Sequence, residues 1–285
     1  MTLAETLHHA ESSLRAASID NARIEAEFLL SHALDLPREA LYARLQEPLS
    51  PAGQATFEAL LRRRLAHEPS AYIVGHMEFY GLDLACTPAA LIPRPETELL
   101  IEEALRWVGD RGSRRGELTV ADVGTGNGAI AVALAVGAPQ AIIVALDTSR
   151  AALSLARHNA TQHGVAGRIA FVQGNLLAPL DDRFDIIAAN LPYIPTRLYR
   201  NLPPELRDHE PEPALHPGRR GPALIESMLA QAPSLLKPGG LLLAEHAWNQ
   251  ARPLRDAARA AFPKSEIETK RDLAGRERLL VVQTS

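Results

Sequence analysis

Apolar side chains recur every three or four positions through the first part of the chain, a pattern typical of amphipathic helices. Ser50 directly precedes Pro51, which favours a helix start there, because serine caps helices and proline fits their first turn. Asp20 and Asn21 offer a similar cap to an earlier helix. Residues 1–68 are therefore predicted to form a small helical domain. The apolar positions behind this prediction are Ile24, Phe28, Leu29, Ala33, Leu34, Phe57, Leu60, Leu61 and Leu65.

The pattern changes over residues 69–95, where we expect a hairpin followed by a linker. Residues 77–84 read as two short strands joined by a turn at Gly81. Pro93 and Pro95 then stiffen the chain before an apolar helix over about residues 97–108. We interpret this stretch as a hinge or lid between two domains.

From residue 117 onward, short apolar runs alternate with helical patterns, and the second domain is predicted to span residues 96–285. Such alternation predicts an α/β fold: a parallel sheet with helices on both faces and a ligand crevice at the carboxyl ends of its strands. No helix separates the last two strands, so the final strand should run antiparallel to its neighbour. The expected strands are residues 118–123, 141–146, 169–173, 184–189, 240–245, 265–270 and 277–283, and the expected helices lie near 128–136, 149–162, 222–236 and 250–260.

Composition narrows the location and the partners. The formal net charge of −4 argues against a protein that wraps free nucleic acid, because such domains usually carry a basic face. Cys86 is the only cysteine, which excludes an internal disulfide and a cysteine-based zinc cluster, and we expect no metal site. We expect a cytoplasmic protein without a signal peptide or a membrane segment. Three arginine groups are interpreted as solvated faces: Arg62-Arg63-Arg64, Arg114-Arg115 and Arg219-Arg220.

A glycine-rich turn follows the first strand of the predicted sheet. Its sequence, Gly124-Thr125-Gly126-Asn127-Gly128, can turn tightly and let the backbone approach a ligand at the start of a helix. Such turns occur in dinucleotide-binding and methyltransferase sheets alike. The G-x-G-x-G spacing, with the acidic Asp122 two residues before the first glycine, favours S-adenosylmethionine over a dinucleotide. We therefore predict that residues 124–128 bind this cofactor.

Two further strand ends supply candidate cofactor contacts. Asp147 closes the second strand about twenty residues after the glycines, where a carboxylate can accept both ribose hydroxyls. Its alternative role is to cap the helix that begins near Ser149. Asn175 and Leu176 follow the third strand, where an acceptor can bind the adenine amino group, and a plain turn at Gly174-Asn175 is the alternative.

The tetrapeptide Asn190-Leu191-Pro192-Tyr193 follows the fourth strand and is predicted to carry the reaction. An amide or aromatic amine nitrogen is a poor nucleophile because its lone pair is delocalised. The Asn190 side-chain oxygen and a backbone carbonyl at position 191 or 192 can accept both N–H protons. This would hold the lone pair toward a sulfonium methyl and stabilise the charge that develops on nitrogen. Tyr193 can pack against the flat substrate group, and Asn190 is also expected to contact the cofactor. The alternative interpretation of the tetrapeptide is a turn that merely ends a strand.

These motifs resemble those of the protein-(glutamine-N5) methyltransferases of the HemK type over nearly the whole chain. The resemblance implies a class I methyltransferase fold, a Rossmann-like seven-stranded sheet with a small N-terminal α-helical domain. It also implies methyl transfer from S-adenosylmethionine to the glutamine of the Gly-Gly-Gln motif in bacterial class 1 peptide chain release factors. The most specific segment is residues 91–98, because other nitrogen methyltransferases lack it. The segments that carry the resemblance are residues 22–30, 78–81, 91–98, 122–126, 186–194 and 210–215.

Two positions depart from the family pattern. Leu191 stands where the family usually has proline, but a backbone carbonyl survives that change and Pro192 still restricts Leu191 to extended conformations. Asn175 stands where the family usually has aspartate, which bears only on the adenine contact.

The tetrapeptide also occurs in ribosomal RNA adenine dimethylases, so an N6-adenine methyltransferase acting on RNA or DNA is a competing interpretation. Those enzymes add their small domain at the C-terminus, whereas here residues 1–68 come first. Residues 92–98 and the acidic net charge also point away from RNA. The chain could also be a glutamine methyltransferase acting on a ribosomal protein, or a binding protein that keeps the fold without the reaction. On the favoured interpretation, residues 1–68 dock the release factor and the protein is a monomer.

Overall fold

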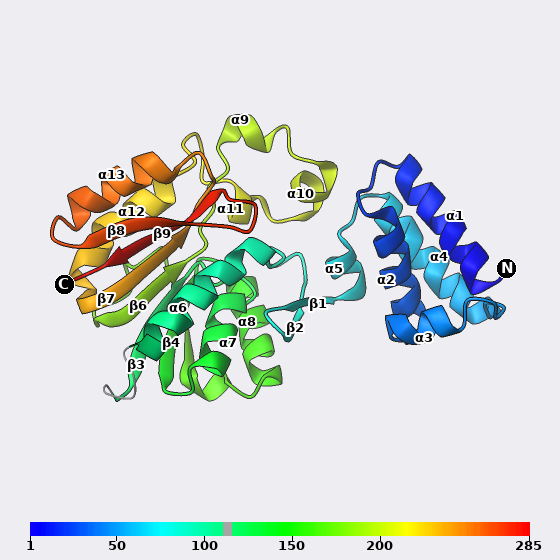
Figure 1. The fold of residues 1–285 in the computed structure, drawn as a ribbon, viewed down its shortest axis with the longest axis horizontal. Coiled ribbons are helices and arrows are strands. Elements are labelled where there is room, and N and C mark those ends of the chain that lie inside the picture. Colours follow the sequence, from blue (N-terminus) through cyan, green and yellow to red (C-terminus); the bar gives the residue numbers. More distant parts are fainter. Residues whose placement is uncertain (111–115) are drawn as a thin grey trace. The chain divides into compact units, whose positions relative to one another are not determined.

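The computed structural model of the chain describes residues 1–110 and 116–285 (Figure 1). The arginine pair at positions 114 and 115 therefore lies outside the described residues. Among the described residues, no helix is both long enough and apolar enough to cross a lipid bilayer. The chain forms two compact units, one made of Met1–His76 with Pro203–His209 and the other of Met77–Leu202 with Glu210–Ser285.

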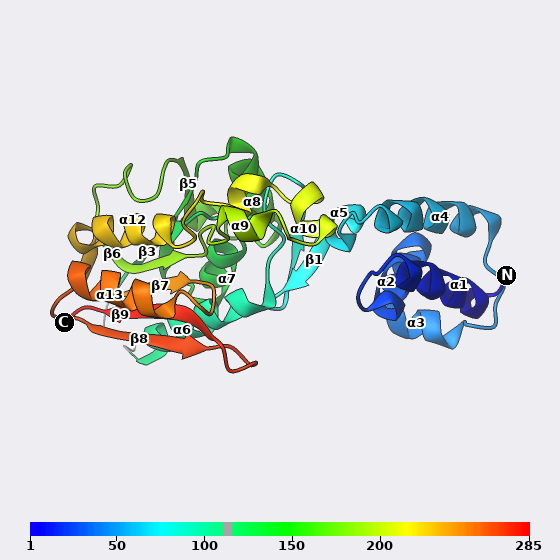
Figure 2. The same cartoon turned by 90° about the horizontal axis from the view of Figure 1, so that it is seen from above.

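The first unit, which we call the helical unit, confirms the prediction of a helical N-terminal region. Its helices are α1 (Leu3–Ala16), α2 (Ala22–Leu34), α3 (Arg38–Ala43), α4 (Pro51–Leu65), α5 (Ser70–Val74) and α10 (Pro204–His209) (Figure 2). Ser50 accepts a hydrogen bond from the Gly53 N–H at 3.1 Å, which confirms the predicted start of α4. Apolar side chains such as Leu7, Leu30 and Phe57 form the core of this unit. Burial of these side chains holds the short helices together.

Two details of α2 differ from the prediction. Ile24 and Phe28 follow the helical period but are 56% and 38% exposed, and the buried face passes through Ala26 and Leu29 instead. Asn21 occupies the N-cap position with a left-handed backbone (φ 53°), and its side chain makes no capping hydrogen bond. The predicted side-chain cap is therefore wrong, because capping of this kind requires an extended backbone at the N-cap residue.

The second unit, which we call the sheet unit, contains a central sheet of seven strands. Its strands are β3 (Leu118–Val123), β4 (Ala141–Asp147), β5 (Ile169–Gln173), β6 (Phe184–Ala189), β7 (Leu236–Glu245), β8 (Glu266–Arg271) and β9 (Glu277–Gln283). They lie in the order β5-β4-β3-β6-β7-β9-β8, with β9 antiparallel to β7 and β8 and the remaining neighbours parallel. This confirms the predicted α/β fold and its antiparallel last strand. The predicted hairpin is also present, as β1 (His76–Phe79) and β2 (Leu82–Ala85).

Helices cover both faces of the seven-stranded sheet, as the alternating pattern predicted (Figure 1). On one face, Leu100 and Ile130 belong to an apolar core shared with the sheet. On the other face, Met228 and Leu254 belong to a second core. The helices of this unit are α6 (Glu98–Asp110), α7 (Ala129–Gly137), α8 (Arg150–Gln162), α9 (Thr196–Tyr199), α11 (Glu212–Leu215), α12 (Ala223–Gln231) and α13 (Ala251–Ala261), with single turns η1 (Pro95–Thr97), η3 (Ala166–Arg168) and η4 (Ala232–Ser234).

The boundary between α12 and β7 differs from the prediction. α12 ends at Gln231 rather than at residue 236, and β7 begins at Leu236 rather than at residue 240. Pro238 and Gly239 therefore lie within a strand. The pairing of β7 with β6 shifts register at this point, and Gly239 has φ 68°. An irregularity of this kind lets a proline and a left-handed glycine occupy a strand that the sequence alone would end.

The strand registers bring four residues to one level at the edge of the sheet where the parallel strands end, which we call the carboxyl edge. Val123 pairs with Leu146 and with Ala189, and Ala189 pairs with Ala244. The residues that directly follow these four are Gly124, Asp147, Asn190 and Glu245. The sequence had marked the first three as site residues, and the sheet places them in neighbouring strands.

Candidate active site

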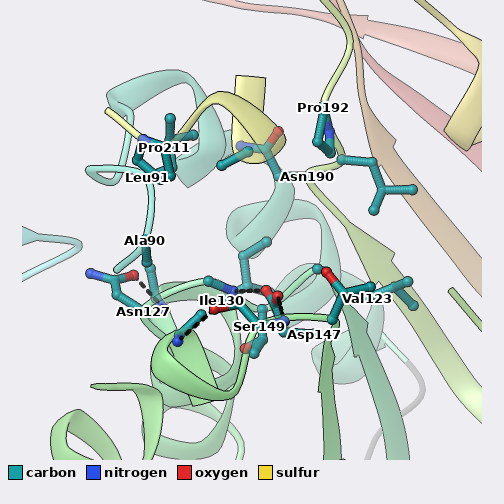
Figure 3. A pocket seen from close by; sticks show the side chains of 18 of the residues that line it. Ala90, Leu91, Val123, Asn127, Ile130, Asp147, Ser149, Asn190, Pro192 and Pro211 are labelled. Carbon is teal, nitrogen blue, oxygen red and sulfur yellow. Dashed lines mark hydrogen bonds between the residues drawn. The ribbon is translucent and has the colours of Figure 1, made fainter. Parts of the chain in front are cut away.

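A cavity of about 240 Å³ opens at the carboxyl edge of the sheet unit. In Figure 3, Asp147 and Ser149 lie on one side of it, and Asn190 and Pro192 lie on the opposite side. Two of the predicted site residues, Gly128 and Tyr193, are not part of its lining. The predicted site residues that line the cavity are Gly124, Thr125, Gly126, Asn127, Asp147, Asn175, Leu176, Asn190, Leu191 and Pro192.

The glycine-rich turn is held tightly against the ends of β4 and β6. Gly124 and Gly126 have φ values of 76° and 57°, which residues with side chains rarely adopt. The N–H groups of Gly124 and Thr125 both donate to the Leu146 carbonyl at 2.8 Å. A Cβ at Gly124 would lie 3.0 Å from Leu191 Cδ2, whereas a Cβ at Gly126 would meet nothing closer than 3.8 Å. The turn therefore packs closely on Leu191 and keeps open backbone at Gly126.

A buried carboxylate supports this turn. Asp122 Oδ2 accepts hydrogen bonds from Thr125 Oγ1 at 2.6 Å and from the Ala131 N–H at 3.1 Å. Asp122 Oδ1 is buried, and no group in the described part of the chain hydrogen-bonds to it. Burial raises the pKa of Asp122 to about 7, against the two hydrogen bonds, which lower it. Because Asp122 does not line the cavity, its role is to fix Thr125 and the start of α7.

Asn127 and Gly128 connect the turn to neighbouring elements. Asn127 Nδ2 donates to the Ala85 carbonyl at 3.4 Å, and the Asn127 carbonyl accepts from Asn159 Nδ2 at 2.8 Å. Gly128 has φ 86°, and a Cβ there would lie 3.0 Å from Ala156 Cβ. These contacts join the start of α7 to the β1–β2 hairpin and to α8.

Asp147 faces the glycine-rich turn from the end of β4 (Figure 3). Its Oδ2 accepts from the Gly126 N–H at 3.0 Å and its Oδ1 accepts from the Ser149 N–H at 2.8 Å. Ser149 is the residue that caps α8, by accepting from the Ala152 N–H at 3.2 Å. Each carboxylate oxygen of Asp147 can accept a second hydrogen bond, and Asp147 lines the cavity. Its carboxylate is therefore available to donors on a bound ligand.

Asn175 and Leu176 follow β5 and form another part of the cavity wall. Asn175 is exposed, whereas Leu176 is buried and has φ 51°, an uncommon conformation for a residue with a bulky side chain. The Gly174 N–H donates to the Asp147 carbonyl at 3.0 Å, which fixes this turn beside β4. The wall here offers one amide side chain and an apolar surface.

Asn190 and Leu191 begin the tetrapeptide and line the cavity. Asn190 Nδ2 donates to Thr97 Oγ1 at 2.9 Å. The side-chain oxygen Oδ1 is therefore not the atom that contacts Thr97. The Leu191 side chain is buried against Gly124. Within residues 1–110 and 116–285, no donor is hydrogen-bonded to the Leu191 carbonyl. The start of the tetrapeptide thus offers two acceptors to a ligand, Asn190 Oδ1 and the Leu191 carbonyl.

Tyr193, at the end of the tetrapeptide, makes its contacts outside the cavity lining. Its hydroxyl donates to Glu245 Oε1 at 3.2 Å, and its carbonyl accepts from Gln250 Nε2 at 2.8 Å. Burial, followed by the nearby Glu245 carboxylate, raises the pKa of Tyr193. Contact between the Tyr193 ring and a substrate stays a prediction.

Two further segments complete the cavity. The family resemblance implied that residues 210–215 lie beside the active site, but sequence analysis named no site residue in either segment. Residues 89–94 line it, as do three residues that follow Glu210, namely Pro211, Pro213 and Ala214 (Figure 3). Glu210 is buried, accepts from the Ile92 N–H at 3.3 Å and forms an ion pair with Arg94. Residues 91–94 and 210–214 belong to motifs that carry the family resemblance. The motifs could therefore have marked these residues as candidates, but not the contact between the two segments.

Thr97 and Glu245 were also missed. Thr97 lies in η1, lines the cavity, and donates its hydroxyl proton to Glu245 Oε2 at 2.6 Å. Glu245 is 2% exposed at the end of β7. Burial raises the pKa of Glu245, against the hydrogen bonds from Thr97 and Tyr193. The signal that could have marked Glu245 in the sequence is its position, since it is a glutamate that directly ends an apolar strand at the carboxyl edge.

Comparison with known proteins decides the family. Residues 5–75 match the family described as PrmC N-terminal domain, and residues 115–275 match a methyltransferase domain. A release factor glutamine methyltransferase of Moorella thermoacetica is 42% identical over 279 residues, which cover 98% of this chain and 97% of that protein. One of Geobacter sulfurreducens is 42% identical over 88% of this chain and 86% of that protein. The chain belongs to the release factor glutamine methyltransferase family. The resemblance that the motifs indicated is confirmed, and the protein is a methyltransferase.

Solved structures agree with the family on the fold. A methyltransferase from Pyrococcus furiosus aligns with a TM-score of 0.53 at 14% identity, over 81% of this chain and 98% of that chain. The 16S rRNA N2 G1207 methyltransferase of T. Thermophilus, solved with AdoMet and guanosine, aligns with a TM-score of 0.52 at 16% identity, over 74% of this chain and 50% of that chain. At these identities the likeness shows the class I methyltransferase fold alone.

Proposed function

We propose that this protein transfers a methyl group from S-adenosylmethionine to the side-chain amide N5 of the glutamine in the Gly-Gly-Gln motif of class 1 release factors. The observation that carries the proposal is the position of Asn190, level with Gly124 and Asp147 at the cavity, with its nitrogen engaged by Thr97. An amide substrate needs acceptors for its two N–H groups, and Asn190 Oδ1 and the Leu191 carbonyl can supply them.

The residues present fit the proposed cofactor. The Asp147 carboxylate can accept the two ribose hydroxyls, open backbone at Gly126 allows close approach, and Asn175 with Leu176 can hold the adenine ring. Thr125 and Asn127 also line this part of the cavity, while Gly128 contributes through packing. S-adenosylmethionine supplies a methyl group on a positively charged sulfur atom.

The chemical task of the chain is then to align a poor nucleophile. Asn190 Oδ1 accepts one N–H of the glutamine amide, and the carbonyl of Leu191 or Pro192 accepts the other. These acceptors hold the nitrogen lone pair toward the methyl group and stabilise the positive charge that develops on nitrogen. No strong base is needed before transfer, since the proton can leave afterward. Most of the acceleration then comes from alignment of the amide nitrogen with the methyl group.

The domain roles belong to the same proposal. Residues 1–68 dock the release factor, residues 69–95 form the hairpin and linker, and residues 96–285 carry out methyl transfer. The acidic net charge of −4 suits a protein substrate better than free nucleic acid. The protein is proposed to act as a monomer in the cytoplasm.

The test is methyl transfer from labelled S-adenosylmethionine to a purified class 1 release factor. Label should appear on the wild-type release factor and be absent from a variant with the Gly-Gly-Gln glutamine replaced by alanine. Parallel reactions with ribosomal RNA and with ribosomal proteins address the competing substrates. Label on RNA with none on release factor would overturn the proposal.

A further inference from the structure

The most specific family segment, residues 91–98, has no role in the reaction described so far. Its member Thr97 takes part in a chain of hydrogen bonds that starts at the candidate acceptor. Asn190 Nδ2 donates to Thr97 Oγ1 at 2.9 Å, and Thr97 Oγ1 donates to Glu245 Oε2 at 2.6 Å. Tyr193 completes the chain by donating to Glu245 Oε1 at 3.2 Å. Asn190 directly follows β6 and Glu245 ends β7, Tyr193 lies in the segment after β6, and Thr97 comes from η1.

With the Glu245 carboxylate ionised, the hydrogen bonds of this chain have only one consistent order of donors and acceptors. A threonine hydroxyl has one proton, and an ionised carboxylate can only accept. Because Thr97 gives its proton to Glu245, it can only accept from Asn190. The group of Asn190 that faces Thr97 must therefore be the amide nitrogen, and the oxygen Oδ1 takes the other position.

The orientation of Asn190 matters because its two amide ends have opposite hydrogen-bonding roles. With Oδ1 turned to the substrate, Asn190 accepts an N–H of the substrate amide. Turned by 180°, it would present a second NH₂ group to that amide, and two donors cannot bond to each other. Rotating the amide without changing its position would therefore remove the acceptor.

We propose that Thr97 and Glu245 are positioning residues that lock the Asn190 amide with Oδ1 toward the substrate nitrogen. The inference rests on the proposed function, because it assigns the acceptor to Asn190. It gives residues 91–98 a task that the cavity lining alone does not reveal. It also explains why a carboxylate that is 2% exposed ends β7 beside the site. Tyr193 takes part as the second donor to that carboxylate.

The decisive variant is Thr97→Val, which keeps the shape of the side chain and removes the hydroxyl. Asn190 then loses the acceptor that fixes both the position and the orientation of its amide, and kcat should fall by about 100-fold, the size of loss that follows a misplacement of about 1 Å. The affinity for S-adenosylmethionine, measured by calorimetry, and the KM for release factor should change little. Thr97→Ser keeps the hydroxyl and should retain most of the turnover. Glu245→Gln, which can donate to Thr97 and reverse the chain, should lower kcat while Thr97 is intact.

A matched control is Thr119→Val at the opposite edge of the same sheet. Thr119 Oγ1 also donates to a buried carboxylate, Asp185 Oδ2, at 2.9 Å, but at the start of β3. This variant loses the same kind of bond and should keep its kcat. A fall in kcat equal to that of Thr97→Val would assign the effect to general destabilisation and overturn the inference.

A double variant separates this inference from the proposed function. If Thr97 acts through Asn190, adding Thr97→Val to Asn190→Ala should lower kcat no further. Full loss of turnover in Asn190→Ala with wild-type kcat in Thr97→Val and Glu245→Gln would overturn the positioning role alone. Wild-type kcat in Asn190→Ala would overturn the proposed role of Asn190 itself. Should Thr97→Val fail to fold, Glu245→Gln and Thr97→Ser give the same comparison.

Discussion

The same kind of contact, a threonine hydroxyl bound to a buried carboxylate, occurs where the parallel strands begin and where they end. At the edge where the parallel strands begin, which we call the amino-terminal edge, Asp185 accepts from the Thr119 hydroxyl and from Lys237 Nζ at 2.7 Å. At the carboxyl edge, Glu245 accepts from the Thr97 hydroxyl, and no salt bridge joins it to a cation within the described residues. Each pair is a threonine bound to a buried carboxylate, and the difference is the charge that accompanies it.

This difference acts on the two carboxylates in opposite directions. Burial raises the pKa of Asp185, but hydrogen bonds from Lys237 and Thr119 outweigh burial and leave the pKa below its ordinary value. Burial also raises the pKa of Glu245, and the bonds from Thr97 and Tyr193 do not offset it. The compensated carboxylate stabilises the fold, whereas the uncompensated one is costly and lies next to the candidate reaction site. Groups whose pKa is shifted by burial often gather at functional sites.

The largest expected effect removes the acceptor that the carboxyl edge presents. Asn190→Ala should lower kcat by a factor of ~100–1000, because one preorganised acceptor is lost. The affinity for S-adenosylmethionine should fall far less, which single-turnover kinetics and calorimetry can separate. Asn190→Asp keeps an acceptor and should retain more activity than Asn190→Ala. Methyl transfer at the wild-type rate in Asn190→Ala would mean that this residue only shapes the cavity.

The next effect concerns cofactor binding at the same edge. Asp147→Ala removes a charged acceptor, and Gly126→Val adds a side chain where φ is 57° and the backbone approaches a ligand. Each change should cost ~1.5–3 kcal/mol of binding free energy, about ten- to a hundredfold in the dissociation constant. Calorimetry with S-adenosylmethionine measures this, with circular dichroism as the check on folding. Unchanged affinity in both variants would remove the cofactor assignment.

A substitution at the amino-terminal edge should lower the stability of the fold and leave kcat unchanged. Lys237→Met should lower the free energy of unfolding by about 1–2 kcal/mol at neutral pH, since a partly solvated partner of Asp185 is lost. Urea unfolding measures this loss, and kcat should stay at the wild-type value. Lys237→Arg keeps the positive charge and serves as the control. A fall in kcat for Lys237→Met would show that the two edges are not independent.

The two carboxylates should change the stability of the fold in opposite directions as pH is varied in the acid range. The pKa of Asp185 is lowered in the fold, so its contribution is present above the unfolded value of about 3.9 and is lost as pH falls through the folded value. The difference in stability between wild type and Lys237→Met should therefore shrink below about pH 3.9. The raised pKa of Glu245 acts the other way, because its burial costs more as pH rises above its unfolded value of about 4.3. A difference that stays constant down to pH 2 would mean that Lys237 stabilises the fold without Asp185.

The sequence predicted the first and last residues of several strands to within one position. The reason is that largely apolar runs such as Leu118–Val123 and Phe184–Ala189 form buried strands. It also predicted that Gly124, Asp147 and Asn190 come together, since parallel strands end at one edge. What it missed at this edge is the contact of Thr97 with Glu245. These residues are 148 positions apart, and nothing local to either one specifies the other.

Other misses have the same physical origin. The ion pair of Arg94 with Glu210 joins positions 116 apart, and only the folded chain brings them together. The exposed Phe28 obeys the helical period but lies off the buried face, because periodicity gives spacing without saying which side meets the core. Local patterns thus predicted the elements and the strand-end residues, whereas contacts between distant segments required the structure.

The smallest expected effect tests whether position 191 acts through its backbone or its side chain. Leu191→Pro restores the residue that the family usually has and keeps the carbonyl, so kcat should change by less than about tenfold, or 1.4 kcal/mol. Some stability should be lost, because the Leu191 side chain is 4% exposed and packs against Gly124. Leu191→Ala is the matched control, since it removes the same packing without restricting the backbone. Both variants should remain far more active than Asn190→Ala in single-turnover transfer to release factor. If either is as inactive as Asn190→Ala, the side chain of Leu191 contributes more than its carbonyl, and the carboxyl edge does not work by acceptors alone.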